Sequence, residues 1–367
     1  MKRPAGSPGL VDTFAIPAST PASIPASILV SILASILTLA VQAGCRPDFA
    51  PYNRLTSLRV LAIQSDPPTP ATGETTMLSA LVFTPAADPA APVPVTVTYA
   101  WSWCPFPGAA NDGHPCLLTE DQVTAFEAMY GVTGQVPPFD LGAAPTAMLP
   151  NTIDPMLLTA LCAGVPGAPQ APDCNGGFPV QVALSVTSFD DSGTQTDQVN
   201  AVFTVRLRFD GGPTAPYSLS TPNAIPMIGA GGITATIAGV PTAIPGLDAA
   251  ATAPITLPRD TATALAADVA ETEAEVYDGL DDDGNPATIT ERLFLTWFVE
   301  TGVTDQSRTS FIDGSTSFPD LLTNTWTPQR FKDYSKPDAR IIVVIHDSRG
   351  GVSWQNGIGI VHLESTP

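Results

Sequence analysis

The chain has 367 residues, with 15 Lys and Arg against 35 Asp and Glu, and a formal net charge of −20 at pH 7. Nucleic acids and anionic membrane surfaces repel so acidic a polypeptide, which excludes both as electrostatic partners. The length is sufficient for two domains of ordinary size.

Residues 28–45 (ILVSILASILTLAVQAGC) form an apolar run that ends in small residues and a cysteine. Such a run is typical of the hydrophobic region of a secretory signal, which sends the rest of the chain to an oxidising compartment. The charged Lys2 and Arg3 lie more than twenty residues before this run. The leader is therefore longer than usual, or translation begins downstream.

Ala43, Gly44 and Cys45 resemble the cleavage site of a bacterial lipoprotein signal, although Gln42 stands where that family has an apolar residue. The resemblance implies a lipid on the Cys45 side chain, membrane attachment through that lipid, and a place in the cell envelope as an outer-membrane or periplasmic lipoprotein. Two alternatives stay open. The run can remain as an uncleaved anchor, because residues 28–44 approach a spanning length, or the protein can be secreted without a lipid.

Composition and turn signals divide the rest of the chain. We expect a leader over 1–45, a spacer over 46–54, a first domain over 55–210, a Pro/Ser/Thr linker over 211–226 and a second domain over 227–367. The first domain opens with strand patterns at 55–63, 75–83 and 93–104. In the last of these, Val97, Tyr99, Trp101 and Trp103 alternate with small polar residues, which predicts one buried face and one wet face.

The four cysteines after Cys45 form two pairs with the same spacing, Cys104 with Cys116 and Cys162 with Cys174. Four cysteines allow three disulfide connectivities, and the spacing does not suit a zinc site. The segments inside both pairs are rich in Pro and Gly and can fold back, which favours the two local bridges.

Between the cysteine pairs the pattern becomes helical. Thr119 and Gln122 form a capping box for a helix over 120–130, and Pro155 after Asp154 opens a second helix that ends near 163. We therefore expect a short two-helix insertion over 105–178, pinned by the disulfides to a β framework. A hairpin over 179–189 and 198–209 closes the domain.

The second half repeats this order loosely, with strand patterns at 233–240, 263–269 and 293–301 and a closing hairpin over 340–347 and 352–364. Both halves place a Trp, Trp101 or Trp297, on an internal strand ahead of a terminal hairpin. This arrangement resembles immunoglobulin-like β-sandwiches, but neither half has their cross-sheet cysteine pair. The expected fold is mainly β, with two tandem immunoglobulin-like antiparallel sandwiches.

Few residues suggest chemistry. The chain has three histidines, His114, His346 and His362, and lacks the G-x-S-x-G and H-E-x-x-H motifs. Asp281, Asp283 and Asn285 carry the hard oxygen ligands that Ca²⁺ prefers. Two EF-hand positions are wrong in this loop, however, so an acidic turn is the alternative interpretation and no cofactor is required.

Trp326 is the candidate aromatic for contacting a ligand from a loop, and its alternative is to plug one end of a sandwich. We expect a non-catalytic binding or structural role at the cell envelope, with an envelope protein or a glycan as partner. A carbohydrate- or peptide-binding lipoprotein is the second hypothesis. An enzyme with a carboxylate site that the sequence does not reveal is the third.

Overall fold

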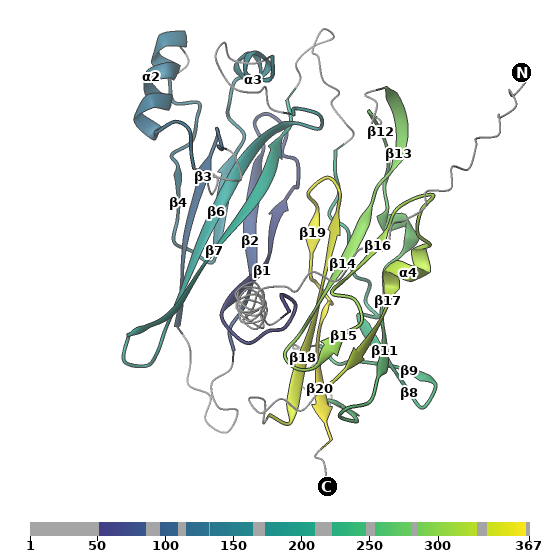
Figure 1. The fold of residues 1–367 in the computed structure, drawn as a ribbon. Coiled ribbons are helices and arrows are strands. Elements are labelled where there is room, and N and C mark those ends of the chain that lie inside the picture. Colours follow the sequence, from purple (N-terminus) through teal and green to yellow (C-terminus); the bar gives the residue numbers. More distant parts are fainter. Residues whose placement is uncertain are drawn as a thin grey trace, which may run out of the picture. The chain divides into compact units, whose positions relative to one another are not determined.

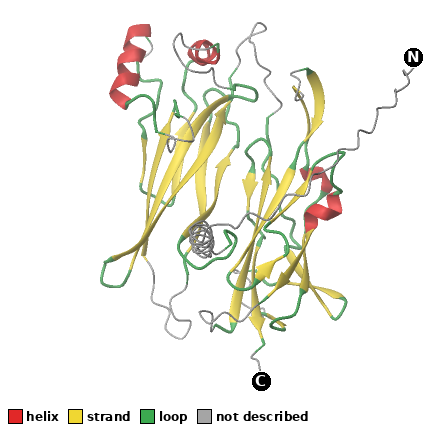
Figure 2. Cartoon of the chain, viewed as in Figure 1, coloured by secondary structure: helices red, strands yellow, loops and turns green. Residues whose placement is uncertain are grey.

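A computed structural model describes residues 51–85, 96–108, 115–131, 133–163, 173–209, 222–246, 254–280, 285–328 and 336–364 (Figure 1). The signal segment and Cys45 lie outside these residues. Within the described part of the chain, no helix is long and apolar enough to cross a bilayer. Strands dominate, and the few helices are short (Figure 2).

The first half of the chain forms two antiparallel sheets. One has the order β1-β2-β5 and the other the order β4-β3-β6-β7. The strands are β1 (Arg59–Asp66), β2 (Thr75–Phe83), β3 (Thr96–Cys104), β4 (Asp140–Gly142), β5 (Thr146–Pro150), β6 (Phe178–Phe189) and β7 (Gln195–Leu207). Their inward side chains share one hydrophobic cluster, so the two sheets make a β-sandwich.

The alternation in β3 has the predicted effect. Trp101 and Trp103 are 1% and 2% exposed, while Ser102 between them and Ala100 before them face water. Each indole N–H is satisfied inside the sandwich: that of Trp101 donates to the carbonyl of Ala144 at 3.0 Å, and that of Trp103 to the carbonyl of Pro138 at 2.9 Å. The tryptophans therefore contribute apolar burial without leaving a buried donor unpaired.

Both predicted helices form. Helix α2 (Glu120–Tyr130) has the capping box of Thr119 and Gln122 and ends at Gly131, whose φ of 72° suits glycine. Helix α3 (Pro155–Cys162) is capped by the Asp154 side chain. Both local disulfides are present: Cys104 is bonded to Cys116, and Cys162 to Cys174.

The insertion differs from the expectation in one respect. Strands β4 and β5 lie inside 105–178 and belong to the sandwich, so α2 and α3 are two separate insertions. The two strands have only three and five residues, too few for a strand period to stand out.

The second half also forms two sheets, of orders β9-β8-β11-β17-β15 and β10-β20-β18-β14-β16. The strands are β8 (Ile233–Ile237), β9 (Val240–Ala243), β10 (Ile255–Leu257), β11 (Thr263–Ala267), β14 (Leu293–Val299), β15 (Val303–Thr304), β16 (Arg308–Phe311), β17 (Thr323–Thr327), β18 (Asp338–Asp347) and β20 (Ile358–Leu363). The smaller elements are the hairpin β12 (Val276–Leu280) and β13 (Pro286–Thr290), β19 (Val352–Ser353), α4 (Phe318–Leu322) and the 3₁₀ turn Glu271–Glu273. Apart from the parallel pair β10 and β20, the pairs are antiparallel.

The two halves share one strand order. The sheet β1-β2-β5 corresponds to β8-β11-β17, and β4-β3-β6-β7 corresponds to β16-β14-β18-β20. The repeat predicted from the sequence is thus a repeat of topology, and each unit has the two-sheet arrangement of an immunoglobulin-like sandwich. The predicted fold class, mainly β with two tandem sandwiches and disulfide-pinned helices in the first, is confirmed.

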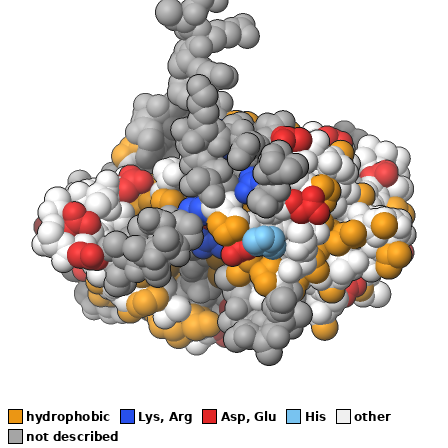
Figure 3. Space-filling model, turned by 90° about the horizontal axis from the view of Figure 1, so that it is seen from below, with side chains coloured by type: hydrophobic (Ala, Val, Ile, Leu, Met, Phe, Trp, Pro, Cys, Tyr) orange, Lys and Arg blue, Asp and Glu red, His pale blue; other side chains and the backbone are white. Residues whose placement is uncertain are grey.

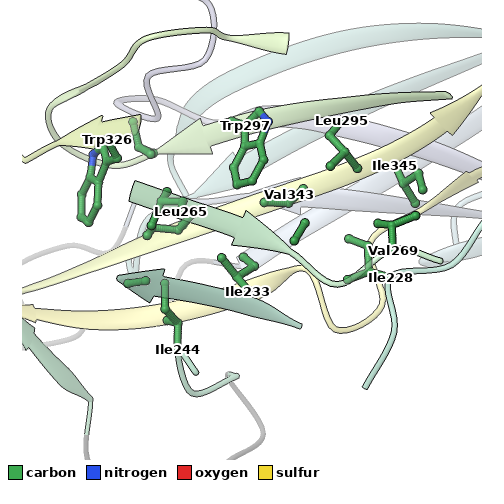
Figure 4. Close-up of a cluster of buried hydrophobic side chains, with 14 of the residues drawn as sticks. Ile228, Ile233, Ile244, Leu265, Val269, Leu295, Trp297, Trp326, Val343 and Ile345 are labelled. Carbon is green, nitrogen blue, oxygen red and sulfur yellow. The ribbon is translucent and has the colours of Figure 1, made fainter. Parts of the chain in front are cut away.

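The core of the second sandwich is built around two tryptophans (Figure 4). Trp297 and Trp326 are both fully buried. The indole N–H of Trp297 donates to the hydroxyl of Thr309 at 3.0 Å, and that of Trp326 donates to the carbonyl of Thr301 at 2.8 Å. As the alternation predicts, Leu293, Leu295, Trp297 and Val299 line the inner face of β14.

Candidate functional site

The outer face of β14 is buried as well, which a strand of an isolated sandwich would not show. Thr296 and Phe298 are 4% and 6% exposed, and both point away from the core that Trp297 fills. The first sandwich covers Phe298. One apolar cluster, here called the junction cluster, joins residues of both sandwiches: Leu55, Ala62, Phe83, Phe298, Ile342, Val344 and Val352.

At the edge of the junction cluster, polar contacts of Arg340 join the two sandwiches. The guanidinium of Arg340 lies 4.5 Å from the ring centroid of Phe83 and donates to the carbonyl of Thr84 at 3.0 Å. It also pairs with the Glu300 carboxylate at 2.8 Å. An arginine that stacks on a ring and is also hydrogen-bonded holds one orientation, so the pair of sandwiches is joined by directional contacts in addition to apolar burial.

The segment before β1 is bound to the second sandwich. The Asn53 side-chain amide donates to the carbonyl of Trp297 at 3.1 Å and to the hydroxyl of Thr304 at 2.8 Å. The Leu55 backbone N–H donates to the carbonyl of Val299 at 2.9 Å. The strand predicted over 55–63 therefore begins only at Arg59, because Leu55 belongs to the junction cluster.

A cleft of about 440 Å³ opens beside the junction cluster. Strands β14, β16 and β18 supply Thr296, Phe298, Arg308 and His346, the first sandwich supplies Arg59, Val60, Leu61, Val199 and Asn200, and the segment before β1 supplies Tyr52. Sheet register explains the first group: Arg308 lies opposite Thr296, and His346 lies opposite Phe294 one pair further along. Cross-strand neighbours on one face bring these side chains together.

The cleft is basic although the protein is acidic. It is lined by two arginines and a histidine and by no described carboxylate. The Arg308 guanidinium lies 5.3 Å from the ring centroid of Phe294, and that of Arg59 donates to the carbonyl of Tyr52. Neither guanidinium forms an ion pair among the described residues. Figure 3 shows one face of the molecule, on which a few basic side chains lie near the centre with an acidic side chain and a histidine beside them, and further acidic side chains lie toward the edges.

His346 is neutral in this setting. Burial, and then the charge of Arg308, lower the pKa of His346 to about 4 from an ordinary 6.5. The imidazole therefore offers one donor and one acceptor at neutral pH and adds no charge to the cleft.

The titration of His346 predicts a pH effect on stability. Between pH 6.5 and about 4 the unfolded chain binds a proton at this position that the folded protein does not. Folding stability should therefore fall as the pH falls through this window, by up to about 3 kcal/mol. Urea unfolding at pH 7 and pH 4 measures it, and the His346→Gln variant should lose less stability on acidification than the wild type does. An equal loss in both proteins would contradict the prediction.

A second charged group lies at the base of the β12–β13 hairpin. The Arg349 guanidinium pairs with Glu275 at 2.5 Å and with Glu291 at 2.6 Å, and stacks 4.2 Å from the ring centroid of Tyr277. Glu291 is 1% exposed. Burial and the nearby Asp347 raise the pKa of Glu291 to about 7, against the opposing effect of Arg349.

This group also binds the segment at residues 223–224, which precedes the strands of the second sandwich. The Asn223 side chain donates to the Asp347 carboxylate at 2.9 Å, and its backbone N–H donates to the hydroxyl of Thr69 at 3.4 Å. The backbone N–H of Ala224 donates to Glu275 at 3.1 Å. The carboxylates of Glu275, Glu291 and Asp347 therefore pair with Arg349, Asn223 and the backbone of Ala224. These contacts indicate a structural role.

The residues proposed for calcium are only partly visible. Asp281 and Asp283 lie outside the described residues, and Asn285 immediately precedes β13. Among the residues that the structure describes, no three His, Cys, Asp or Glu side chains gather as a metal site. Calcium binding at Asp281, Asp283 and Asn285 stays a prediction.

The ligand-contacting role considered for Trp326 is wrong. Its side chain is fully buried and its indole N–H is bonded to Thr301, so it plugs the sandwich, as the alternative interpretation held. Two further aromatic side chains also pack inward, Phe106 against Phe178 and Phe318, in α4, against Phe311. His114 lies outside the described residues, and His362 forms an exposed cross-strand pair with Asp338 at 2.8 Å.

Comparisons with known proteins add little to these observations. No protein-family model and no curated protein sequence matches the chain. Solved structures that are similar to the chain, at low scores, include the following two. The D00-D0 domain of intimin has 11% identity and a TM-score of 0.20, covering 84% of this chain and 99% of that one.

The second is a structure of Clostridium thermocellum CbhA fibronectin(III)-like modules, with 9% identity and a TM-score of 0.16, covering 82% of this chain and 93% of that one. Scores of this size establish neither a common fold nor a common function. The chain's own strand order defines its class, a tandem β-sandwich protein.

Sequence reasoning missed the junction cluster and the cleft, although one signal was available. Residues 293–299 (LFLTWFV) are apolar at Phe294 and Phe298 as well as on the alternating inner positions. A strand that is apolar on both faces is typical of a strand covered on both sides. The sequence contains no comparable signal that indicates which part of the protein covers the outer face of this strand.

Proposed function

We propose that this is a non-catalytic protein of the bacterial cell envelope, fastened to the membrane by a lipid on Cys45, in which both sandwiches act as one rigid body with a structural or binding role. The observation that carries the proposal is the junction. An apolar cluster and directional polar contacts join the sandwiches, and the segment that follows the anchor is part of the same junction.

Asn53 and Leu55 connect the proposed anchor to the junction. They lie eight and ten residues after Cys45 and are held by the backbone and side chains of the second sandwich. An anchor attached at this point pulls on both sandwiches together instead of on the first one alone. Such a connection suits a protein that keeps a fixed orientation toward what it contacts.

The disulfides support an extracytoplasmic location. Each closes a loop between cysteines separated by 12 residues, and bonds of this kind persist in oxidising compartments and are rare in the cytosol. A chain-entropy argument gives each bridge a stabilisation of about 3 kcal/mol, which a reducing compartment would remove.

Mass spectrometry of the mature N-terminus, purified from membranes of an expressing bacterium, tests the anchor. We expect the chain to begin at Cys45 with a mass increase equal to attached acyl chains, since several chains are needed for firm membrane binding. The Cys45→Ser variant should leave the membrane fraction. An unmodified Cys45, or a wild-type chain recovered in the soluble fraction, would contradict the proposal.

A further inference from the structure

We propose that the cleft beside the junction cluster binds an organic anion, with a carboxylate or phosphate group at Arg59, Arg308 and Thr296 and an apolar body against Val60, Leu61 and Phe298. The inference concerns the folded part of the chain and is independent of the lipid anchor. It rests on three features of the cleft, taken in turn.

The first feature is two arginines that form no ion pair with a carboxylate among the described residues, in a protein that has an excess of carboxylates. The other arginines that form ion pairs, Arg206, Arg340 and Arg349, each face an Asp or Glu. Arg59 comes from the first sandwich and Arg308 from the second, yet both line the same cleft. Guanidinium groups recognise carboxylate and phosphate oxygens through paired hydrogen bonds, so their convergence favours an anionic ligand.

The second feature is a buried hydroxyl that has no partner. The Oγ1 atom of Thr296 is inaccessible to solvent and forms no hydrogen bond among the described residues, and the residue is 4% exposed. Thr296 lines the cleft and lies directly opposite Arg308 in the sheet. An unsatisfied buried hydroxyl costs about 1–3 kcal/mol, and a ligand oxygen beside Arg308 would accept its hydrogen bond.

The third feature is the remaining wall. Val60, Leu61, Val199 and Phe298 supply apolar surface, and the imidazole of His346 is uncharged at neutral pH. A volume of about 440 Å³ falls in the range of small-molecule sites. Apolar walls with a few convergent polar groups indicate a ligand that has a charged head and an apolar body.

Isothermal titration calorimetry with octanoate and with octyl phosphate tests the proposal. Both share the apolar chain, so their relative affinities distinguish a carboxylate from a phosphate head group. We expect saturable binding of at least one of them. Neutral octanol, and acetate or inorganic phosphate without the chain, should each bind at least tenfold more weakly.

Three variants locate the site. Arg59→Gln and Arg308→Gln should each weaken binding at least tenfold, whereas Arg206→Gln, which removes a distant arginine paired with Asp173, should leave it unchanged. Thr296→Val should weaken binding severalfold while leaving the thermal midpoint of the free protein unchanged or higher, because it removes a hydroxyl without a partner. A merely structural threonine would not give both results.

Several outcomes would overturn the proposal. One is that neither octanoate nor octyl phosphate binds. Another is that octanol, acetate or inorganic phosphate binds as tightly as the chain-bearing anions do. The third is that the Arg59→Gln and Arg308→Gln variants bind the anion as tightly as the wild type does. Circular dichroism confirms that each variant is folded, so a loss of binding can be assigned to the site.

Discussion

Replacing Trp297 with alanine is expected to lower the free energy of unfolding by about 3–5 kcal/mol. The side chain is fully buried in the core of the second sandwich, and its indole N–H is bonded to the hydroxyl of Thr309. The substitution leaves a cavity that the surrounding sheets cannot close. It also removes one partner of Thr309, whose hydroxyl still donates to the carbonyl of Leu321 at 2.6 Å.

Urea unfolding followed by far-ultraviolet circular dichroism measures this loss. Trp297→Phe keeps most of the volume and should lose less, and Met156→Ala, at a position 82% exposed, should lose almost nothing. A loss below about 1 kcal/mol for Trp297→Ala would show that the residue is not central to the core.

Replacing Phe298 with aspartate is expected to separate the two sandwiches. Phe298 lies in the junction cluster, and a carboxylate buried there without a partner costs several kcal/mol, which opening the junction relieves. Differential scanning calorimetry should therefore show one cooperative transition for the wild type and two for the variant.

Val202→Asp is the matched control. It introduces the same charge on β7 at a position 51% exposed, and it should keep the single transition. Limited proteolysis gives a second readout, because a separated variant should be cut between the two sandwiches, in the linker expected over 211–226, faster than the control. Two transitions in the wild type, or one unchanged transition in the Phe298 variant, would refute the rigid junction.

The two substitutions differ in what they affect. Trp297 and Phe298 are adjacent in β14, and their side chains point to opposite faces. One supports the inside of a sandwich and the other the contact between sandwiches. Replacing Trp297 should destabilise the second sandwich. Replacing Phe298 should uncouple the two sandwiches while each remains folded.

Local chemistry was sufficient for much of the fold. The alternation around Trp101 and around Trp297 places these residues correctly, because a strand sends successive side chains to opposite faces. The capping box of Thr119 and the Pro155 helix start act within one helical turn. The disulfides were also predictable, since each bridge closes a short loop.

What the sequence by itself determined is therefore local: the strand periods, helix starts, close cysteine pairs and the order of elements that the two halves share. Only the tertiary structure decided which strands are neighbours, that β4 and β5 belong to the sandwich, and that Trp326 faces inward. The tertiary structure also decided that Arg59 and Arg308, which are 249 positions apart in the sequence, line one cleft. The physical reason is that sheet register and packing between sandwiches join residues distant in the chain, and no local pattern encodes the partner of a surface.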